Sequence, residues 1–193
     1  MNSIVNILTQ LRTHTSTLHS ELEQTPLSLA LLDADVSSHN YVAYLQKMRG
    51  IIDFYEGTVF PVLKNTLTDL SEREKLAAID KDLEYMSAES NNLPVFANPV
   101  AINPTIAYAF GCMYVIEGST LGGKVILKHI SKMLGILPDE GGTYFASYGE
   151  QTGHYWKTFL NNLQEYSANN NCDAEIITGA KDTFTAIKHY FEQ

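Results

Sequence analysis

The chain has 193 residues, of which 45% are hydrophobic and 18% are charged, a balance that is typical of globular proteins and excludes a disordered chain. Its formal net charge of −9 at pH 7 disfavours nucleic acid and anionic membrane surfaces as partners. Because the N-terminus lacks the basic start and apolar run of a signal peptide, and no apolar stretch is long enough to span a membrane, we expect one cytoplasmic domain over residues 1–193.

Helical spacing of apolar residues organises the first half of the chain. Leucine and isoleucine recur at intervals of three, four and seven residues near the N-terminus, which predicts an amphipathic helix that Ser3 caps. Pro26 favours the start of a short second helix, and Pro61 is expected to kink or end the main part of a long third one. The helices expected in this half cover residues 3–24, 26–33, about 38–66 and 71–88.

The second half of the chain begins with a connector. Three prolines within 91–104 disfavour a helix there, and Leu-Pro-Asp-Glu-Gly-Gly predicts a loop within 134–147. No segment shows the sustained alternation of a β-strand. The remaining segments predict helices over residues 105–133, about 150–167 and 173–191. The whole pattern indicates an all-α, single-domain helical bundle.

One face of the first helix groups polar side chains. At about 100° per residue, Thr15, His19 and Glu23 follow one another on one face, and Arg12 returns to nearly the same face about 10 Å from His19. An imidazole is a good iron ligand, and a carboxylate one turn away can orient it. His14 points roughly 140° away from His19 and is the weaker candidate. The alternative is an ordinary His–Glu pair on a helix surface.

Glycines interrupt an otherwise helical pattern in the segment that begins at Tyr114. Each interior glycine costs roughly 0.5–1 kcal/mol relative to alanine, so the three glycines sacrifice about 2–3 kcal/mol. Gly118 and Gly122 are one turn apart, and Ser119 and Gly123 adjoin them. Together they predict a patch of nearly bare backbone that a flat group can approach closely. Two alternatives remain open, namely close packing against another helix and a helix end at Gly122–Gly123.

The two groups of residues occur together, in this order, in one known family. The chain resembles the biliverdin-producing heme oxygenases, whose proximal-helix motif is similar to Leu11-Arg12-x-x-Thr15-x-x-x-His19-x-x-x-Glu23. Their distal-helix motif is similar to Gly118-Ser119-x-x-Gly122-Gly123, and the form Glu-Gly-Ser-Thr-Leu-Gly-Gly is most similar to bacterial members. The resemblance covers nearly the whole chain and implies a heme oxygenase-like helical bundle.

The resemblance also implies roles for individual residues. His19 is then the proximal iron ligand with Glu23 as its partner, and Arg12 and Lys157 are basic groups near the heme propionates. On the distal side, the missing side chains of Gly118 and Gly122 leave room for O2. The catalytic set implied is Gly118, Ser119 and Gly122. The heme-binding set implied is Arg12, Thr15, His19, Glu23, Tyr114, Gly118, Gly122, Gly123 and Lys157.

The reaction that the resemblance implies is the oxidative cleavage of heme to biliverdin, CO and iron. Heme is both substrate and cofactor, and the partners are O2 and an electron donor such as a ferredoxin or a reductase. The helices over 3–24 and 105–133 are then expected to face each other across a cleft.

One position departs from the family pattern. Well-studied members often carry an aspartate directly after the first distal glycine, where this chain has Ser119. A hydroxyl can hold a water but carries no charge, so we expect the proton path to use backbone and water. Two other functions stay open: a heme-binding or heme-storage protein with little turnover, and a protein of the same helical architecture, such as a thiaminase-like protein, that acts on another small molecule.

Overall fold

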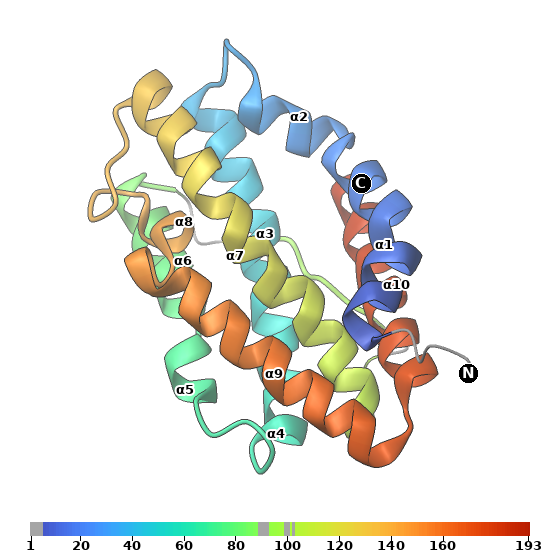
Figure 1. Cartoon of the computed structure of the whole chain (residues 1–193). Helices are drawn as coiled ribbons and strands as arrows, with labels where there is room; N and C mark the ends of the chain where they lie inside the picture. Colours follow the sequence, from blue (N-terminus) through green and yellow to red (C-terminus); the bar gives the residue numbers. More distant parts are fainter. Residues whose placement is uncertain (1–5, 89–92, 99–100, 102) are drawn as a thin grey trace.

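The structure, a computed structural model, describes residues 6–88, 93–98, 101 and 103–193. Within these ranges the chain is built from helices, and the only β pairing is a pair of isolated bridges at Leu137 (Figure 1). The all-α expectation is therefore confirmed. The helices are α1 (Ile7–Glu23), α2 (Pro26–Leu32), α3 (Ser38–Thr58), α4 (Phe60–Leu63), α5 (Leu70–Arg73), α6 (Leu76–Tyr85), α7 (Ile106–Leu134), α8 (Thr143–Ala146), the 3-10 helix η2 (Gly149–Gln151), α9 (Thr152–Asn170) and α10 (Asp173–Phe191).

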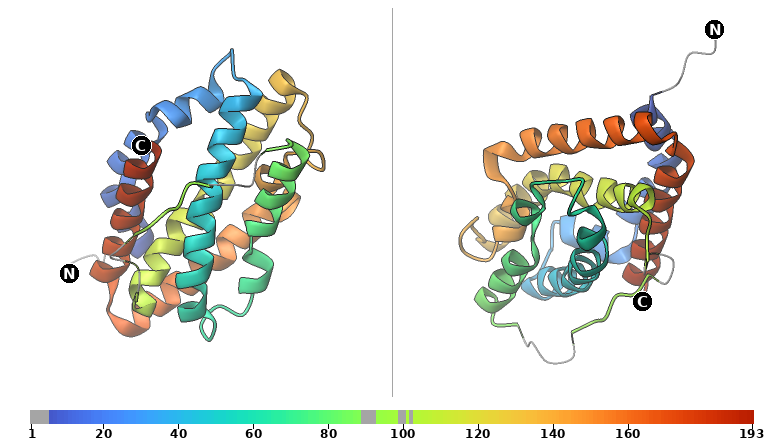
Figure 2. Two further views of the ribbon diagram at one scale, coloured as in Figure 1. Left: turned by 180° about the vertical axis from the view of Figure 1, so that it is seen from behind. Right: turned by 90° about the horizontal axis from the view of Figure 1, so that it is seen from below.

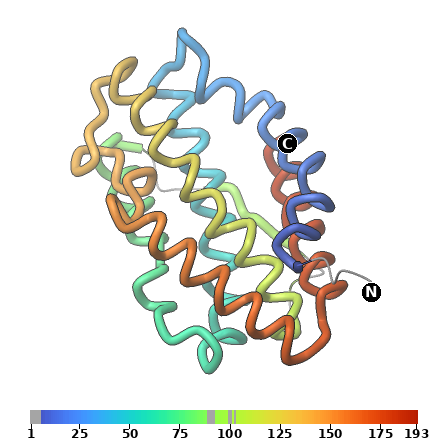
Figure 3. The backbone as a smooth tube through the Cα atoms, viewed as in Figure 1, coloured from blue at the N-terminus to red at the C-terminus, as the bar shows by residue number. Residues whose placement is uncertain are grey.

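Helix α7 is the centre of the arrangement. It packs most extensively along α10 and is also covered by α8 and α9, and the view from below in Figure 2 shows it between α9 and α3. Helix α1 packs mainly on α10, so the first and last helices run next to each other, as Figure 3 shows. Helix α2 reaches α7, where Nε2 of His129 lies 2.9 Å from the carbonyl oxygen of Asp33. Through α10 and α2, the positions of α1 and α7 are therefore linked.

The expected helix boundaries agree with the structure in most places. Helix α3 ends at Thr58, and Val59 joins it to α4, in which Pro61 lies in the first turn. The expected interruption at Pro61 is thus confirmed. The expected cap Ser3 lies outside the described residues, within which the side chain of Asn6 caps α1 by accepting the backbone N–H of Leu8. None of the described helices is both long and apolar enough to cross a membrane.

The continuous helix expected over 71–88 is wrong. Glu74 adopts an extended conformation with φ −61° and ψ 136°, which ends α5 before α6 begins. Because of this break, Arg73 and Lys75 are both buried, although they are only two residues apart. A continuous helix would place such neighbours about 200° apart around its axis.

Helix α7 passes through its glycines without interruption. It continues from Ile106 to Leu134 and ends at Gly135, which has the left-handed φ of 72° that favours glycine at a helix end. A helix end at Gly122–Gly123 is therefore excluded. The loop that Leu-Pro-Asp-Glu-Gly-Gly predicts within 134–147 is present, and the short helix α8, which was not expected, follows it and packs against α7.

Candidate functional site

The exposed face of α1 carries His19 and Glu23. Nδ1 of His19 lies 3.4 Å from Oε2 of Glu23, and the two side chains are 57% and 63% exposed. The ring of His19 also meets Phe184 of α10 edge to face, with centroids 5.7 Å apart. When the neutral ring carries its proton on Nδ1, toward the carboxylate, Nε2 keeps the lone pair that a metal requires. The structure thus leaves a potential ligand nitrogen accessible.

The other polar residues of α1 separate into two groups. Arg12 is exposed, and its charge acts on Tyr114 of α7, opposing the rise in the Tyr114 pKa that burial causes. Thr15 is only 3% exposed, and its hydroxyl donates to the carbonyl oxygen of Leu11 at 2.8 Å. Thr15 is therefore buried, and it does not share the exposed face of α1 on which the sequence placed it with His19 and Glu23. His14 is exposed like His19, so the contacts with Glu23 and Phe184 distinguish the two histidines.

Gly118 and Gly122 form an uncovered surface on α7. A Cβ atom on Gly122 would have no neighbour within 4 Å, and one on Gly118 would first meet Cη2 of Trp156 at 3.5 Å, an ordinary contact. Close helix packing therefore does not explain these two glycines. It does explain Gly123, because a Cβ there would lie 2.7 Å from the carbonyl oxygen of Phe145. Gly123 accordingly faces α8, away from the uncovered surface.

Apolar side chains flank this bare backbone. Leu121 is 47% exposed and Val125 is 66% exposed, which is unusual for large aliphatic residues on a central helix. At the other end of the glycine face, the rings of Tyr114 and Trp156 lie 5.5 Å apart. Exposed apolar groups beside bare backbone suit a flat, largely apolar ligand.

Two further observations limit what the site can hold. Over the described part of the chain, no group of three or more His, Cys, Asp and Glu side chains is placed to bind a metal ion. Lys157 lies on α9 next to Trp156 and is exposed, with no hydrogen bond or ion pair to another described residue. Its expected role at the site therefore has no support from a contact.

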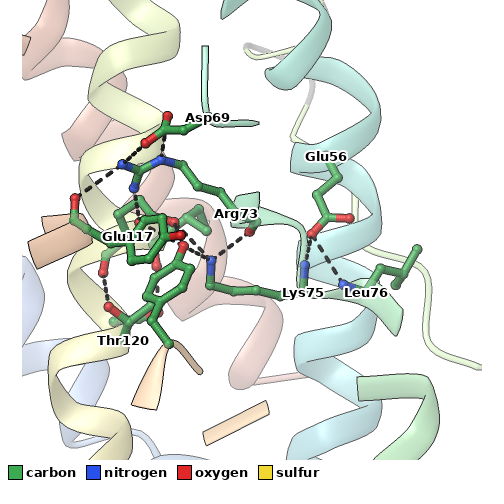
Figure 4. Close-up of polar contacts among 11 residues, drawn as sticks. Glu56, Asp69, Arg73, Lys75, Leu76, Glu117 and Thr120 are labelled. Carbon is green, nitrogen blue, oxygen red and sulfur yellow. Dashed lines mark hydrogen bonds and ion pairs between the residues drawn. The ribbon is translucent and has the colours of Figure 1, made fainter. Parts of the chain in front are cut away.

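A buried polar network behind the glycine face was not expected from the sequence. Glu117, the residue before Gly118, is 1% exposed. Its carboxylate accepts hydrogen bonds from Nη1 of Arg73 at 2.5 Å, Nζ of Lys75 at 2.9 Å and the hydroxyl of Tyr148 at 2.8 Å. Figure 4 shows Arg73 and Lys75 reaching Glu117 from the break between α5 and α6. The only sequence signal was an acidic residue inside a long apolar run, which does not identify its partners.

The surrounding residues balance the charges of this network. Asp69 accepts two hydrogen bonds from Arg73, at 3.0 and 2.7 Å, and Glu56 accepts the backbone N–H of Lys75 at 2.5 Å. Burial lowers the pKa of Lys75, while the charge of Glu117 opposes that change. Burial also raises the pKa of Tyr148. Lys75 is thus a cation that can release a proton more readily than an exposed lysine.

Nearly the whole chain matches one known family. The family model described as Heme oxygenase matches residues 5–193. A comparison with curated protein sequences gave no match. Among solved structures, the NO- and CO-bound heme oxygenase of Neisseria meningitidis is 21% identical, with 97% of this chain and 92% of that chain covered and a TM-score of 0.70.

Two further solved structures are similar. Heme oxygenase-1 of Synechocystis, in complex with heme, is 15% identical, with 97% and 91% of the two chains covered and a TM-score of 0.76. Heme oxygenase 2 of Chlamydomonas reinhardtii, solved without heme, is 14% identical, with 97% and 96% covered and a TM-score of 0.80. At these identities, the likeness shows a shared fold.

Proposed function

The chain belongs to the heme oxygenase family and is a heme-degrading oxidoreductase, and on this premise we propose that it cleaves heme to biliverdin, CO and iron. Heme is its substrate and its prosthetic group. O2 and an external electron donor, such as a ferredoxin or a reductase, complete the proposed reaction. Family membership does not favour the alternatives of heme storage or of another small-molecule substrate.

The residues present fit a heme. A heme iron needs as little as one protein ligand, because the porphyrin supplies four nitrogens, and the accessible Nε2 of His19 suits that role. A flat porphyrin could lie against the backbone at Gly122, where a Cβ atom would have no neighbour within 4 Å, and beside Gly118, where the ring of Trp156 adjoins the bare backbone. The exposed Leu121 and Val125 offer it apolar contacts.

Each residue then has a limited chemical task, since bound heme supplies the redox chemistry with O2. His19 would bind the iron, and Glu23, whose Oε2 lies 3.4 Å from Nδ1 of His19, would hold the Nδ1 proton in place. The missing side chains of Gly118 and Gly122 would leave space for a small molecule beside a bound heme. Arg12, a cation on the same exposed surface as His19, is proposed to pair with a propionate.

The observation that carries this proposal is the uncovered Gly122. A glycine inside a helix costs about 0.5–1 kcal/mol relative to alanine, and here no contact within the protein needs the missing side chain. Access for a ligand is the remaining benefit. Cleavage of a bound heme would require such access for O2.

The test is a titration of the purified protein with hemin, followed by addition of ascorbate under air. We expect a one-to-one complex with the visible spectrum of a histidine-bound heme, and then replacement of that spectrum by biliverdin absorption with release of CO. A stable complex that yields neither product would indicate heme storage. Absence of a defined complex would indicate another ligand.

A further inference from the structure

His129 lies where the glycine face of α7 approaches α2. It follows Gly122 by seven residues, so the helix returns it to nearly the same face about 10 Å farther along. Its Nε2 atom lies 2.9 Å from the carbonyl oxygen of Asp33, the residue that ends α2. Because a carbonyl oxygen can only accept, the ring nitrogen donates in this contact. A hydrogen bond thus joins α7 to the end of α2.

The carbonyl oxygen of Asp33 is held in place by the turn that follows α2. It also accepts the backbone N–H of Val36 at 3.3 Å, and Val36 is buried. In the same turn, Oδ1 of Asp33 accepts the backbone N–H of Asp35 at 2.8 Å. The acceptor for His129 is therefore a backbone group in a hydrogen-bonded turn, so its position follows that of α2.

Side chains tie the corner between α1 and α2. Only Gln24 and Thr25 separate the two helices. The hydroxyl of Thr25, which is buried, donates to the carbonyl oxygen of Leu22 at 2.9 Å, and its oxygen caps α2 by accepting the backbone N–H of Ser28. The hydroxyl of Ser28 donates to the same carbonyl oxygen at 2.9 Å. Since the linker is short and bonded to both helices, a movement of α2 away from α7 would also move α1.

Apolar packing alone does not fix the end of α2 on α7. Leu29 and Leu32 of α2 are exposed, and so is Met133 of α7, one turn after His129. Apolar contacts have no preferred direction, whereas a hydrogen bond weakens steeply when its angle or distance changes. The contact between His129 and Asp33 therefore supplies the directional link between these two helices.

The proposed heme site uses both of the helices that are linked in this way. His19 of α1 would bind the iron and Gly122 of α7 would lie against the porphyrin, so a bound heme would touch both helices. The charge of Arg12 on α1 also acts on Tyr114 of α7, so the two helices lie within electrostatic reach of each other. How firmly α1 is held relative to α7 then determines how easily a bound heme can leave.

We propose, on the basis of the proposed function, that His129 is a positioning residue for heme binding. Through Asp33 and the corner at Thr25, it holds the helix of the iron ligand in a fixed position relative to the glycine face, and it thereby slows the departure of heme. The effect passes through the backbone of α2 and requires no contact between His129 and the heme.

The experiment measures the rate at which hemin leaves the protein, by its transfer to an excess of apomyoglobin. His129→Ala removes the donor, and His129→Gln keeps a side-chain N–H that can reach the carbonyl oxygen of Asp33. His154→Ala is the matched control, because His154 is exposed in the first turn of α9 and its ring meets Tyr155. Visible spectra check the iron ligand, and melting temperatures of the heme-free proteins check folding.

We expect His129→Ala to release hemin about fivefold faster, as the loss of one hydrogen bond implies. His129→Gln should stay within about twofold of the unmodified protein, because the bond is retained. His154→Ala should not change the rate. All three complexes should keep the spectrum of a histidine-bound heme, since His19 is untouched.

A second variant tests whether the effect passes through the corner between α1 and α2. Thr25→Val removes the hydroxyl that ties the two helices, so we expect hemin to leave about threefold faster. Because Thr25 is buried, this change does not act by direct contact with heme. The double variant with His129→Ala should release hemin no faster than the faster single variant, since both changes break the same connection.

Three results would overturn the inference. If His129→Ala releases hemin at the rate of the control, the contact does not hold α1 in place. If His129→Gln is as fast as His129→Ala, the hydrogen bond is not responsible. If the two effects multiply in the double variant, Thr25 and His129 act separately. In each case, a defined hemin complex of the unmodified protein leaves the proposed function intact, whereas the absence of such a complex would overturn the proposed function and this inference with it.

Discussion

Helix α7 carries glycines for two different reasons in two regions. Where α7 crosses α10, a Cβ on Gly111 would lie 2.0 Å from the carbonyl oxygen of Ile176, and one on Gly179 would lie 2.2 Å from that of Tyr108. Farther along α7, a Cβ on Gly122 would meet nothing within 4 Å. The first region is closed by backbone contact, and the second is open. One residue type in one helix therefore serves folding at the first place and ligand access at the second.

The energetic balance also differs between the two regions. At the crossing, the cost of glycine in a helix is offset by the close approach of two long helices and the burial of their side chains. At Gly122 the same cost has no compensation within the protein. Single substitutions can test this difference, and the largest effect is expected at the crossing.

Gly111→Ala should damage the fold. The added methyl group cannot fit 2.0 Å from a backbone oxygen, so α7 and α10 must move apart. Such overpacking typically costs about 3 kcal/mol, which lowers the melting temperature of a chain of this size by roughly 6–12 °C. Differential scanning calorimetry of the heme-free protein measures this change. An unchanged melting temperature would mean that the crossing is looser than the structure indicates.

His19→Ala should abolish the histidine-bound heme spectrum while the fold survives, because the His19 side chain is 57% exposed. His14→Ala is the matched control, since His14 is exposed on the same helix but contacts neither Glu23 nor Phe184. Visible and resonance Raman spectra after hemin titration separate the two variants. If the variants exchange behaviours, the iron ligand has been assigned to the wrong face of α1.

Gly122→Ala should raise the stability of the heme-free protein and lower its turnover. Alanine is the better helix former and meets no neighbour here, so the heme-free protein should gain about 0.5–1 kcal/mol of stability. Heme should still bind through His19, but the methyl group would occupy space above the ring, and biliverdin formation should slow or stop. Calorimetry and product yield on the same preparation test both statements. A less stable variant with normal turnover would remove Gly122 from the proposed site.

Gly57→Ala should have the smallest effect. Gly57 of α3 is also uncovered, since a Cβ atom there would have no neighbour within 4 Å, but it lies outside the proposed site. Stability should rise by about a few tenths of a kcal/mol, because the position is near the helix end, and turnover should not change. The same two measurements apply. A loss of turnover equal to that of Gly122→Ala would show that the effect is not specific to the open region.

Local sequence signals predicted the helices well where the residues at the ends of a helix determine where it begins and ends. Helix α3 begins at the expected residue, and α7 begins and ends within one residue of its expected limits. In the structure, the side-chain caps at Ser37 and Thr105 and the left-handed Gly135 that ends α7 are all local features. The expected helix over 71–88 failed because the break at Glu74 depends on distant partners. It lets Arg73 and Lys75 both bond to Glu117, more than 40 residues away.

The candidate site also combines features that local sequence predicted with features that depend on distant segments. Its residues on one helix were recognisable because helical spacing places His19 and Glu23 one turn apart, and the structure has them 3.4 Å apart. Which glycines are covered was not readable, since Gly111, Gly118, Gly122 and Gly123 look alike in sequence. The burial of Thr15 was likewise not readable from the sequence, because it depends on which other helix packs against that side of α1.

The sequence by itself determined the helical character of the chain, the turn-by-turn spacing of His19 and Glu23, and the helical pattern that continues on both sides of the glycines. These properties depend on backbone geometry over one or two turns. Only the tertiary structure decided that Gly111 closes a helix crossing while Gly122 remains open, and that Glu117 joins Arg73 and Lys75 in a buried network. Those properties depend on which distant segments meet, because burial and charge pairing arise only when separate helices come into contact.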